Sequence, residues 1–228
     1  MPYLGALDRY HRYEIDGLEH VPRRGPALLV AFHSFLTIDM FLLARAIYLR
    51  DGRIVRGLTD KLVFRVPGLR DVASRLGVVA GTQSNGLELL RRGAIAACMP
   101  GGALEWSRPR RMRRTMRWGE HRGYARLAIR SGAPIIPTAC PAADRAYYVP
   151  FDGWTIGLAL QRCLGASRAL PLPIAIGLGP LPMPVRLVQH VAPAITTDEP
   201  PDAADDERAV RRLDERVRDT IAGLLRLP

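Results

Sequence analysis

Residues 28–47, LLVAFHSFLTIDMFLLARAI, join an apolar run, a histidine and a second apolar segment that carries an aspartate. The first run, from Ala27 to Phe32, has the length and composition of a buried strand. The second reads as a helix that is apolar on most faces, with Thr37 as its predicted N-cap. His33 and Asp39 therefore stand at the seam of two hydrophobic elements, where polar groups are costly unless they are paired or have chemistry to perform.

The rest of the chain repeats this alternation of strand and helix, which predicts an α/β fold with a largely parallel central sheet flanked by helices. We expect a single domain over residues 1–228, with a core at about 13–197 and a C-terminal helix at about 204–226. Apolar positions at helical spacing mark that last helix. The third quarter is rich in proline and is predicted to be a loop-rich excursion with short helical patches. Further strands are predicted at 13–16, early in GRIVRGLTDKLVFRVP, and in GVVAG, AIAACMPGG, PIIPTA and PVRLVQHVAPAI. Helices are predicted to end near Leu76, to run from Ser84 or Asn85 to Gly93, and to lie within RGYARLAIR.

The composition bounds the class of protein and of partner. The 228 residues are 48% hydrophobic and 24% charged, which excludes a disordered chain and suits one sizeable domain. The net charge is +11, and Lys61 is the only lysine, so the positive charge is almost entirely guanidinium. An anionic partner is expected: a membrane surface, a phosphorylated substrate or cofactor, or nucleic acid. A GC-biased genome also favours such an arginine content.

The three cysteines are widely spaced, which favours a reducing compartment and predicts neither a disulfide framework nor a metal site. The first residues, MPYLGALDRYHRYEIDG, lack the apolar region of a signal peptide. The longest apolar stretch, 169–185, is broken by prolines and glycines. We therefore expect a cytoplasmic protein that lies on the inner face of the membrane without crossing it.

Two strand ends are predicted to meet at one edge of the sheet. His33 follows one buried strand and MPGG, residues 99–102, follows another, and ligands commonly bind beyond the carboxyl ends of parallel strands. A histidine held by an aspartate can deprotonate a hydroxyl, so we expect the His33 ring to touch the Asp39 carboxylate beside the glycines. The residues alone leave a second interpretation open, in which Asp39 stabilises a helix start and His33 is a core residue. Because no GxSxG nucleophile is present, activation of a bound hydroxyl is favoured over a covalent intermediate.

Four blocks in order resemble the glycerolipid acyltransferase superfamily, most closely its diacylglycerol-acyltransferase-like branch. GLEHVPRRGPALLVAFHSFLTIDMFLL resembles the first block, although five residues separate His33 from Asp39 where the family signature has four. MPGGALEW resembles the proline-glycine-glycine block of that branch. RGYARLAIRSGAPIIP and LPMPVRLVQHVAPAI, with the terminal helix, resemble the later blocks. The resemblance implies direct acyl transfer from a thioester, acyl-CoA or acyl carrier protein, to a hydroxyl of a glycerolipid or other lipid alcohol.

The resemblance also implies the roles of individual residues. His33 and Asp39 would be catalytic, and Gly101, Gly102, Glu105 and Arg122 would bind substrate. The glycines would offer backbone N–H groups to the oxyanion, and a plain turn after the strand explains them equally well. Glu105 would either hydrogen-bond the acceptor or anchor its loop. No bound cofactor or metal is implied. The arginine that relatives use for an acceptor phosphate is absent, since Leu104 precedes Glu105 and GVVAGT lacks the second one, so a neutral hydroxyl such as that of diacylglycerol is favoured.

The arginine-rich segment, residues 106–124, follows the glycine block directly and interleaves arginines with tryptophans. Such a segment fits the phosphates of a donor or an anionic membrane surface, with tryptophans at the lipid interface; a plain solvated loop is the simpler alternative. The residues expected there are Trp106, Arg108, Arg110, Arg111, Arg113, Arg114 and Trp118.

Two other classes of function remain open. A nucleic-acid-binding protein would use the same arginines and aromatics, and its affinity would fall steeply with salt while His33→Ala left it intact. That class leaves the strand-end histidine and the glycine block without a role. A catalytically inactive, lipid-binding relative is the other alternative, and it would show no turnover to lose.

Overall fold

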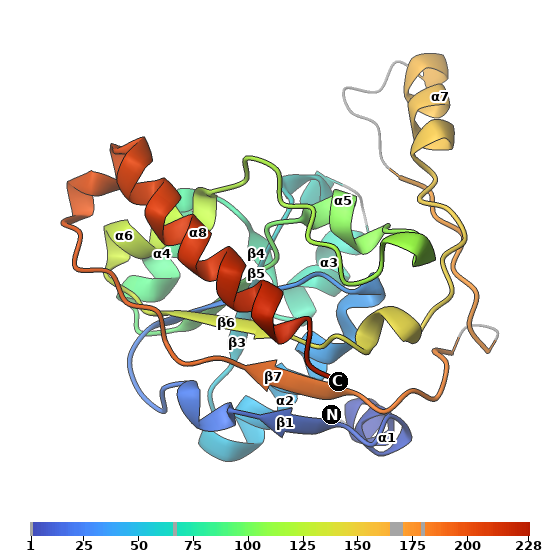
Figure 1. The fold of residues 1–228 in the computed structure, drawn as a ribbon, viewed down its shortest axis with the longest axis horizontal. Helices are drawn as coiled ribbons and strands as arrows, with labels where there is room; N and C mark the ends of the chain where they lie inside the picture. Colours follow the sequence, from blue (N-terminus) through green and yellow to red (C-terminus); the bar gives the residue numbers. More distant parts are fainter. Residues whose placement is uncertain (1, 66–67, 165–170, 179–180) are drawn as a thin grey trace.

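The computed structural model describes residues 2–65, 68–164, 171–178 and 181–228. A seven-stranded sheet runs through it in the order β1-β7-β6-β2-β5-β3-β4 (Figure 1). Every neighbouring pair is parallel except β6 with β7. The predicted α/β fold with a largely parallel sheet is therefore confirmed. The strands are β1 (Glu14–Asp16), β2 (Ala27–Ala31), β3 (Val55–Thr59), β4 (Val79–Ala80), β5 (Ile95–Cys98), β6 (Ile135–Ala139) and β7 (Val188–Val191).

Helices cover both faces of the sheet, and the alternation of side chains along β2 shows how the layers form. Leu28 and Val30 pack in one hydrophobic cluster with α4, α6 and α8, whereas Leu29 and Ala31 pack in another with α2. Every residue of β2 is buried because both of its faces are covered. The helices are α1 (Pro2–Tyr10), α2 (Ile38–Asp51), α3 (Leu69–Arg75), α4 (Gln83–Arg91), α5 (Gly102–Trp106), α6 (Gly123–Ser131), α7 (Trp154–Leu164) and α8 (Glu207–Leu224).

The register of the central strands places the two predicted motifs at one edge. Ala27 pairs with Ile95 and Val30 with Cys98, so β2 and β5 end side by side. His33 and the turn at 99–102 follow those ends directly. The expectation that both motifs open on the same edge of the sheet is met.

Several elements differ from the sequence-based expectations. Thr37 precedes α2 but makes no side-chain cap, because its φ of 50° is left-handed and a capping residue needs an extended backbone. α4 begins at Gln83, earlier than expected, because the Thr82 hydroxyl accepts the N–H of Asn85 at 3.0 Å. The third quarter holds a full helix, α7, which stands away from the body in Figure 1.

Within the described ranges, no helix combines the length and the apolar character needed to cross a bilayer. Of the apolar stretch 169–185, residues 169–170 and 179–180 lie outside the described residues.

Candidate active site

His33 follows β2 and is held by its own backbone neighbour. Its Nδ1 lies 2.9 Å from the carbonyl oxygen of Ser34. A carbonyl can only accept, so Nδ1 carries the proton and Nε2 keeps its lone pair. The pKa of His33 is lowered to about 4: burial lowers it most, the hydrogen bond to the Ser34 carbonyl raises it, and the charge of Arg108 lowers it. The imidazole is therefore neutral at pH 7, with Nε2 in the form of a proton acceptor.

Asp39 reaches this histidine through Ser34. The Ser34 hydroxyl donates a short hydrogen bond to Oδ1 of Asp39, and both residues are buried. Among the described residues, neither ring nitrogen of His33 bonds to the Asp39 carboxylate, which corrects the expectation of direct contact. The physical reason is the 3-10 turn Phe35–Thr37, in which Leu36 and Thr37 both have left-handed backbones; the chain reverses there and leaves Ser34 between the two groups.

The pKa of the Asp39 carboxyl group is higher than that of an ordinary aspartate. Burial raises its pKa to about 6, while hydrogen bonds from the Ser34 hydroxyl and from backbone N–H groups at the start of α2 lower it. Asp39 is thus mostly ionised at pH 7, although only about one pKa unit separates it from protonation.

The glycine turn is shaped by two different constraints. The N–H of Gly102 donates to the Met99 carbonyl at 3.1 Å, and its φ of 47° is left-handed. A Cβ on Gly101 would lie 2.4 Å from a carboxylate oxygen of Glu105. Both positions therefore require glycine, but the Gly102 N–H is already engaged within the turn, contrary to the expectation that both N–H groups face an oxyanion.

Glu105 is fully buried and anchors the site. Oε2 accepts the backbone N–H of His33 at 2.9 Å and the indole N–H of Trp118 at 3.1 Å, while Oε1 accepts the backbone N–H of Arg117 at 3.0 Å. Burial raises the pKa of this carboxyl, and these hydrogen bonds lower it. The carboxylate holds the loops together, so of the two roles expected for Glu105 these contacts fit the loop anchor rather than the acceptor-binding group: its oxygens face the chain itself.

The arginine-rich segment divides into a buried part and an exposed part. Arg108 is 5% exposed; its guanidinium binds Asp144 at 2.5 Å and the His33 carbonyl at 3.3 Å, and lies 4.1 Å from the Phe32 ring. Trp118 is 1% exposed and stacks edge-on against Tyr124. These two residues belong to the core, which corrects their expected place at a donor phosphate or a membrane surface; there the Arg108 guanidinium donates to Asp144 and the Trp118 indole donates to Glu105.

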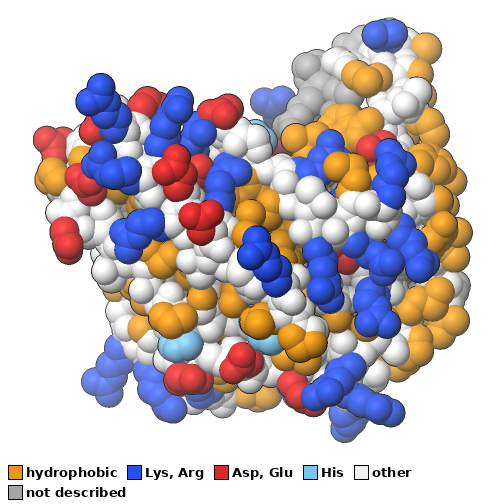
Figure 2. All heavy atoms as spheres, in the orientation of Figure 1, with side chains coloured by type: hydrophobic (Ala, Val, Ile, Leu, Met, Phe, Trp, Pro, Cys, Tyr) orange, Lys and Arg blue, Asp and Glu red, His pale blue; other side chains and the backbone are white. Residues whose placement is uncertain are grey.

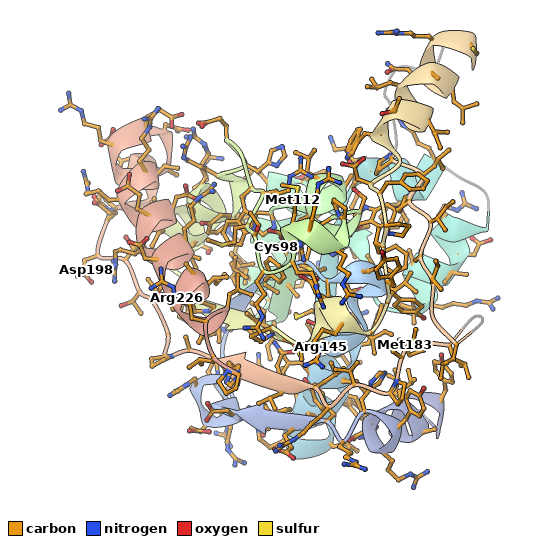
Figure 3. The ribbon with its side chains drawn as sticks, turned by 45° about the vertical axis from the view of Figure 1, so that its right-hand side comes forward. Cys98, Met112, Arg145, Met183, Asp198 and Arg226 are labelled. Carbon is orange, nitrogen blue, oxygen red and sulfur yellow. The ribbon has the colours of Figure 1, made fainter. Side chains whose placement is uncertain are left out.

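Two arginines of the exposed part, Arg110 and Arg113, line a narrow groove of about 10 Å³ beside the His33 loop. Phe35, two residues after His33, packs against Trp106 at 5.7 Å and against Tyr147 at 5.2 Å between ring centroids. Arg110, Arg111 and Arg114 are exposed, and Arg113 is half-buried. The backbone N–H of Arg114 donates to the Asp144 carboxylate at 3.0 Å. Figure 3 shows Met112 within this loop. The groove is lined by Phe35, Trp106, Arg108, Arg110, Arg113, Asp144, Tyr147 and Val149.

Arg122 lies apart from these contacts, at the start of α6. Its guanidinium pairs with Glu120 and, at 3.2 Å, with Asp214 of α8. Asp214 is buried and also accepts the hydroxyl of Tyr124 at 2.6 Å. A second hollow, open to the surface, lies here between α6 and α8. It is lined by Glu120, His121, Arg122, Gly123, Arg126, Glu207 and Arg211.

Three residues of the site were missed from the sequence. Ser34 was set aside because it lies too close to His33 to be a nucleophile, and its linking role depends on the turn that follows. Asp144 lies 36 residues from Arg108, and Asp214 lies 92 residues from Arg122, so no local spacing marks either of these two pairs. In the part of the chain that the structure describes, no group of histidine, cysteine and carboxylate side chains is arranged to hold a metal ion.

Comparison with known proteins finds relatives of similar sequence. A human protein described as "DGAT1/2-independent enzyme synthesizing storage lipids" is 34% identical over 128 residues, 56% of this chain and 39% of that protein. An uncharacterized protein of Mycobacterium tuberculosis is 30% identical over 221 residues, 93% of this chain and 60% of that protein. The chain thus spans about two fifths of the length of the human relative and three fifths of that of the mycobacterial one.

The fold likeness extends to a solved structure. The 1-acyl-sn-glycerophosphate acyltransferase PlsC of Thermotoga maritima superimposes with a TM-score of 0.56 at 14% identity, over 99% of this chain and 80% of that one. The family model described as Acyltransferase matches residues 12–141, which include β1, β2, the His33 loop, the glycine turn and β6. The chain belongs to the Acyltransferase family.

Proposed function

We propose that the chain transfers a fatty acyl group from a thioester to a hydroxyl of a glycerolipid or other lipid alcohol, with His33 as general base. The observation that carries this proposal is the hydrogen bond from His33 Nδ1 to the Ser34 carbonyl, which directs the free lone pair to Nε2. This imidazole lies beyond the carboxyl end of β2, beside the glycine turn after β5. Membership of an acyltransferase family supports the reaction class.

The proposed step is a direct transfer without a covalent enzyme intermediate. Nε2 removes the proton of the acceptor hydroxyl as the oxygen attacks the thioester carbonyl; the new ester C–O bond forms, the C–S bond breaks, and the imidazolium returns the proton to the thiolate. The Ser34 carbonyl stabilises the N–H of Nδ1 while the ring is charged. Asp39 is a positioning residue, because it acts on His33 through Ser34. The backbone N–H of Gly101 is the group we assign to the oxyanion.

The donor and the acceptor follow from the surroundings of the groove. Arg110, Arg111, Arg113 and Arg114 would bind either the phosphate of acyl-CoA or acyl carrier protein or the anionic headgroups of the membrane, with Trp106 against the acyl chain. Arg122, which lines the separate hollow at α6, is the further residue assigned to substrate. The absent acceptor-phosphate arginines favour a neutral lipid hydroxyl. The printed description of the human relative, an enzyme that synthesises storage lipids, is consistent with such an acceptor. We place this reaction on the inner face of the cytoplasmic membrane, as a peripheral protein.

The test is an assay of purified protein with labelled palmitoyl-CoA or palmitoyl-acyl carrier protein. The acceptors are diacylglycerol, monoacylglycerol, lysophosphatidate and a long-chain alcohol, and mass spectrometry identifies the product. His33→Ala should lower kcat by about 100- to 10,000-fold, the usual contribution of a general base, while circular dichroism shows an intact fold. His20→Ala is the matched control, because its Nδ1 bonds to the Val191 carbonyl, away from the proposed site.

Two outcomes would reject the proposal in different ways. Lipid binding by the wild type with no product from any donor would identify an inactive relative. Salt-sensitive binding of single-stranded RNA that His33→Ala leaves intact, again with no product, would identify a nucleic-acid-binding protein.

A further inference from the structure

The excursion between β6 and β7 exposes aliphatic side chains in an ordered pattern. Leu172, Ile174, Ile176 and Leu178 alternate along an extended segment, and each is between 46% and 54% exposed. Alternate residues of an extended chain point to the same side, so these four form one apolar face. The residues between them are less exposed.

Helix α7 belongs to the same excursion and also exposes aliphatic side chains. Ile156, Leu158 and Leu160 are 42–45% exposed. The helix and the extended segment meet at Gly153, where the N–H of Leu172 donates to the Gly153 carbonyl at 3.4 Å and an added Cβ would collide with Leu172. Figure 3 shows α7 projecting from the body with its side chains directed outward. We call the seven aliphatic residues of these two paragraphs the apolar protrusion.

The apolar protrusion carries very little charge. Between residues 146 and 185 the sequence contains only three charged residues, Asp152, Arg162 and Arg168. Asp152 is the sole carboxylate, and it accepts the N–H of Trp154 at 3.2 Å, at the start of α7. A water-facing surface is normally rich in charged side chains, and a contiguous exposed apolar patch marks a protein or membrane interface.

Arginines border the apolar protrusion where it joins the proposed site. Tyr148 forms an antiparallel β-bridge with Ile176 through two backbone hydrogen bonds of 2.8 and 2.9 Å. The Arg110 guanidinium lies 5.2 Å from the centroid of the Tyr148 ring. Tyr147, the residue before it, packs against Phe35 of the His33 loop. Figure 2 shows arginines gathered beside an apolar edge on this side of the molecule. The order along the surface is therefore apolar protrusion, arginine border and groove.

We propose that the apolar protrusion inserts into an anionic lipid bilayer, at the boundary of headgroups and acyl chains, while Arg110, Arg111 and Arg113 bind the headgroups. Apolar side chains with an arginine border have the distribution that an interfacial segment requires. The same border disfavours a second copy of this chain, because two such surfaces would bring like charges together. This arrangement would place the groove at the lipid surface, where the acceptor lies. Membrane insertion itself is independent of the proposed function; only the placement of the groove rests on it.

The first test measures binding to vesicles without any acyl donor. Purified protein is sedimented with vesicles of phosphatidylcholine alone or with 30 mol% phosphatidylglycerol. The double variant Leu158→Glu with Ile174→Glu should bind the anionic vesicles at least about 30-fold more weakly, since two apolar side chains are replaced by charges. The matched control is Leu49→Glu with Ile54→Glu, because those residues are 63% and 54% exposed on α2 and just after it. The control should bind like the wild type.

Further variants separate the arginine border from the apolar protrusion and from catalysis. Arg110→Gln with Arg111→Gln should remove most of the preference for phosphatidylglycerol and leave binding to phosphatidylcholine unchanged. His33→Ala should bind vesicles like the wild type, so loss of turnover and loss of membrane binding are independent results.

The second test reports where α7 lies when the protein is bound. Cys163, in the last turn of α7, is exposed, whereas Cys140 is buried and Cys98 is half-buried. Burial raises the pKa of Cys98 to about 12 and that of Cys140 well above its usual value, so an environment-sensitive fluorophore should react selectively with Cys163. Anionic vesicles should shift its emission to the blue, and lipids with spin labels on the acyl chain should quench it.

Three results would overturn the inference. Equal vesicle binding by the Leu158/Ile174 variant and the wild type is the first, and a label at Cys163 that stays in water on bound protein is the second. The third is a stable dimer in sedimentation equilibrium that the same double variant dissociates, which would assign the apolar protrusion to a second copy of the chain.

Discussion

The backbone N–H of His33 donates to Oε2 of Glu105 at 2.9 Å, although 72 residues separate them in the sequence. The same carboxylate binds Arg117 and Trp118, so one buried acid fixes the histidine loop, the glycine turn and the arginine-rich segment relative to one another. The position of the proposed general base thus depends on a residue that does not touch its ring.

Replacement of Glu105 by glutamine tests this anchor. An amide has only one acceptor oxygen, so at least one of the three N–H donors must face the NH₂ group. We expect Glu105→Gln to lower the free energy of unfolding by about 2–4 kcal/mol, measured by urea denaturation. Glu88→Gln is the control; its exposed carboxylate pairs with Arg92, and its loss should cost about 0.5 kcal/mol or less. Equal effects of the two changes would show that Glu105 is no anchor.

A double-mutant cycle tests the link from Asp39 through Ser34 to His33. Ser34→Ala removes the donor of the hydrogen bond, and Asp39→Asn removes the charge of its acceptor. Each change should lower kcat by about tenfold or more with little change in KM. The kcat of the double variant should equal that of the less active single variant, because both changes interrupt one link. Multiplied effects in the double variant would mean that Asp39 acts on the reaction by another route.

The pH dependence of stability should separate the two buried groups. The pKa of His33 is lowered from 6.5 to about 4, so the unfolded chain binds more protons between these values and stability rises with pH. The pKa of Asp39 is raised from 3.8 to about 6, so the folded chain binds more protons there and stability falls as pH rises. The two contributions nearly cancel in the wild type.

Single variants should reveal each contribution. Between pH 4 and pH 6, Asp39→Asn should gain stability more steeply than the wild type, and His33→Asn should gain less or lose stability. Each contribution amounts to about 3 kcal/mol at most, given shifts of about two pKa units. The measurement is the free energy of unfolding in urea at pH 4, 5, 6 and 7. Identical pH profiles for all three proteins would show that neither group has a shifted pKa.

The buried ion pair of Arg108 with Asp144 should be important for stability in a way that the neighbouring exposed arginines are not. Removing one partner of such a pair leaves an uncompensated buried charge, which typically costs about 3–5 kcal/mol. We expect Arg108→Gln to lower the melting temperature strongly and Arg111→Gln to leave it nearly unchanged. Calorimetry of both variants checks this, and a small effect at Arg108 would argue against the buried pair.

The sequence determined the fold class and the edge of the sheet at which the site lies. The apolar run before His33 predicted a buried strand, and the alternation of strands and helices along the chain predicted a largely parallel sheet covered by helices. Both predictions rest on local patterns of neighbouring residues.

The tertiary structure alone decided how the polar groups are paired. Two left-handed residues in the Phe35–Thr37 turn place Ser34 between His33 and Asp39, and Glu105, Asp144 and Asp214 find partners 36 to 92 residues away. It also decided which arginines of one continuous segment are buried and which border the groove. Such pairings depend on where distant loops meet after the core has packed, and no spacing along the chain encodes that meeting.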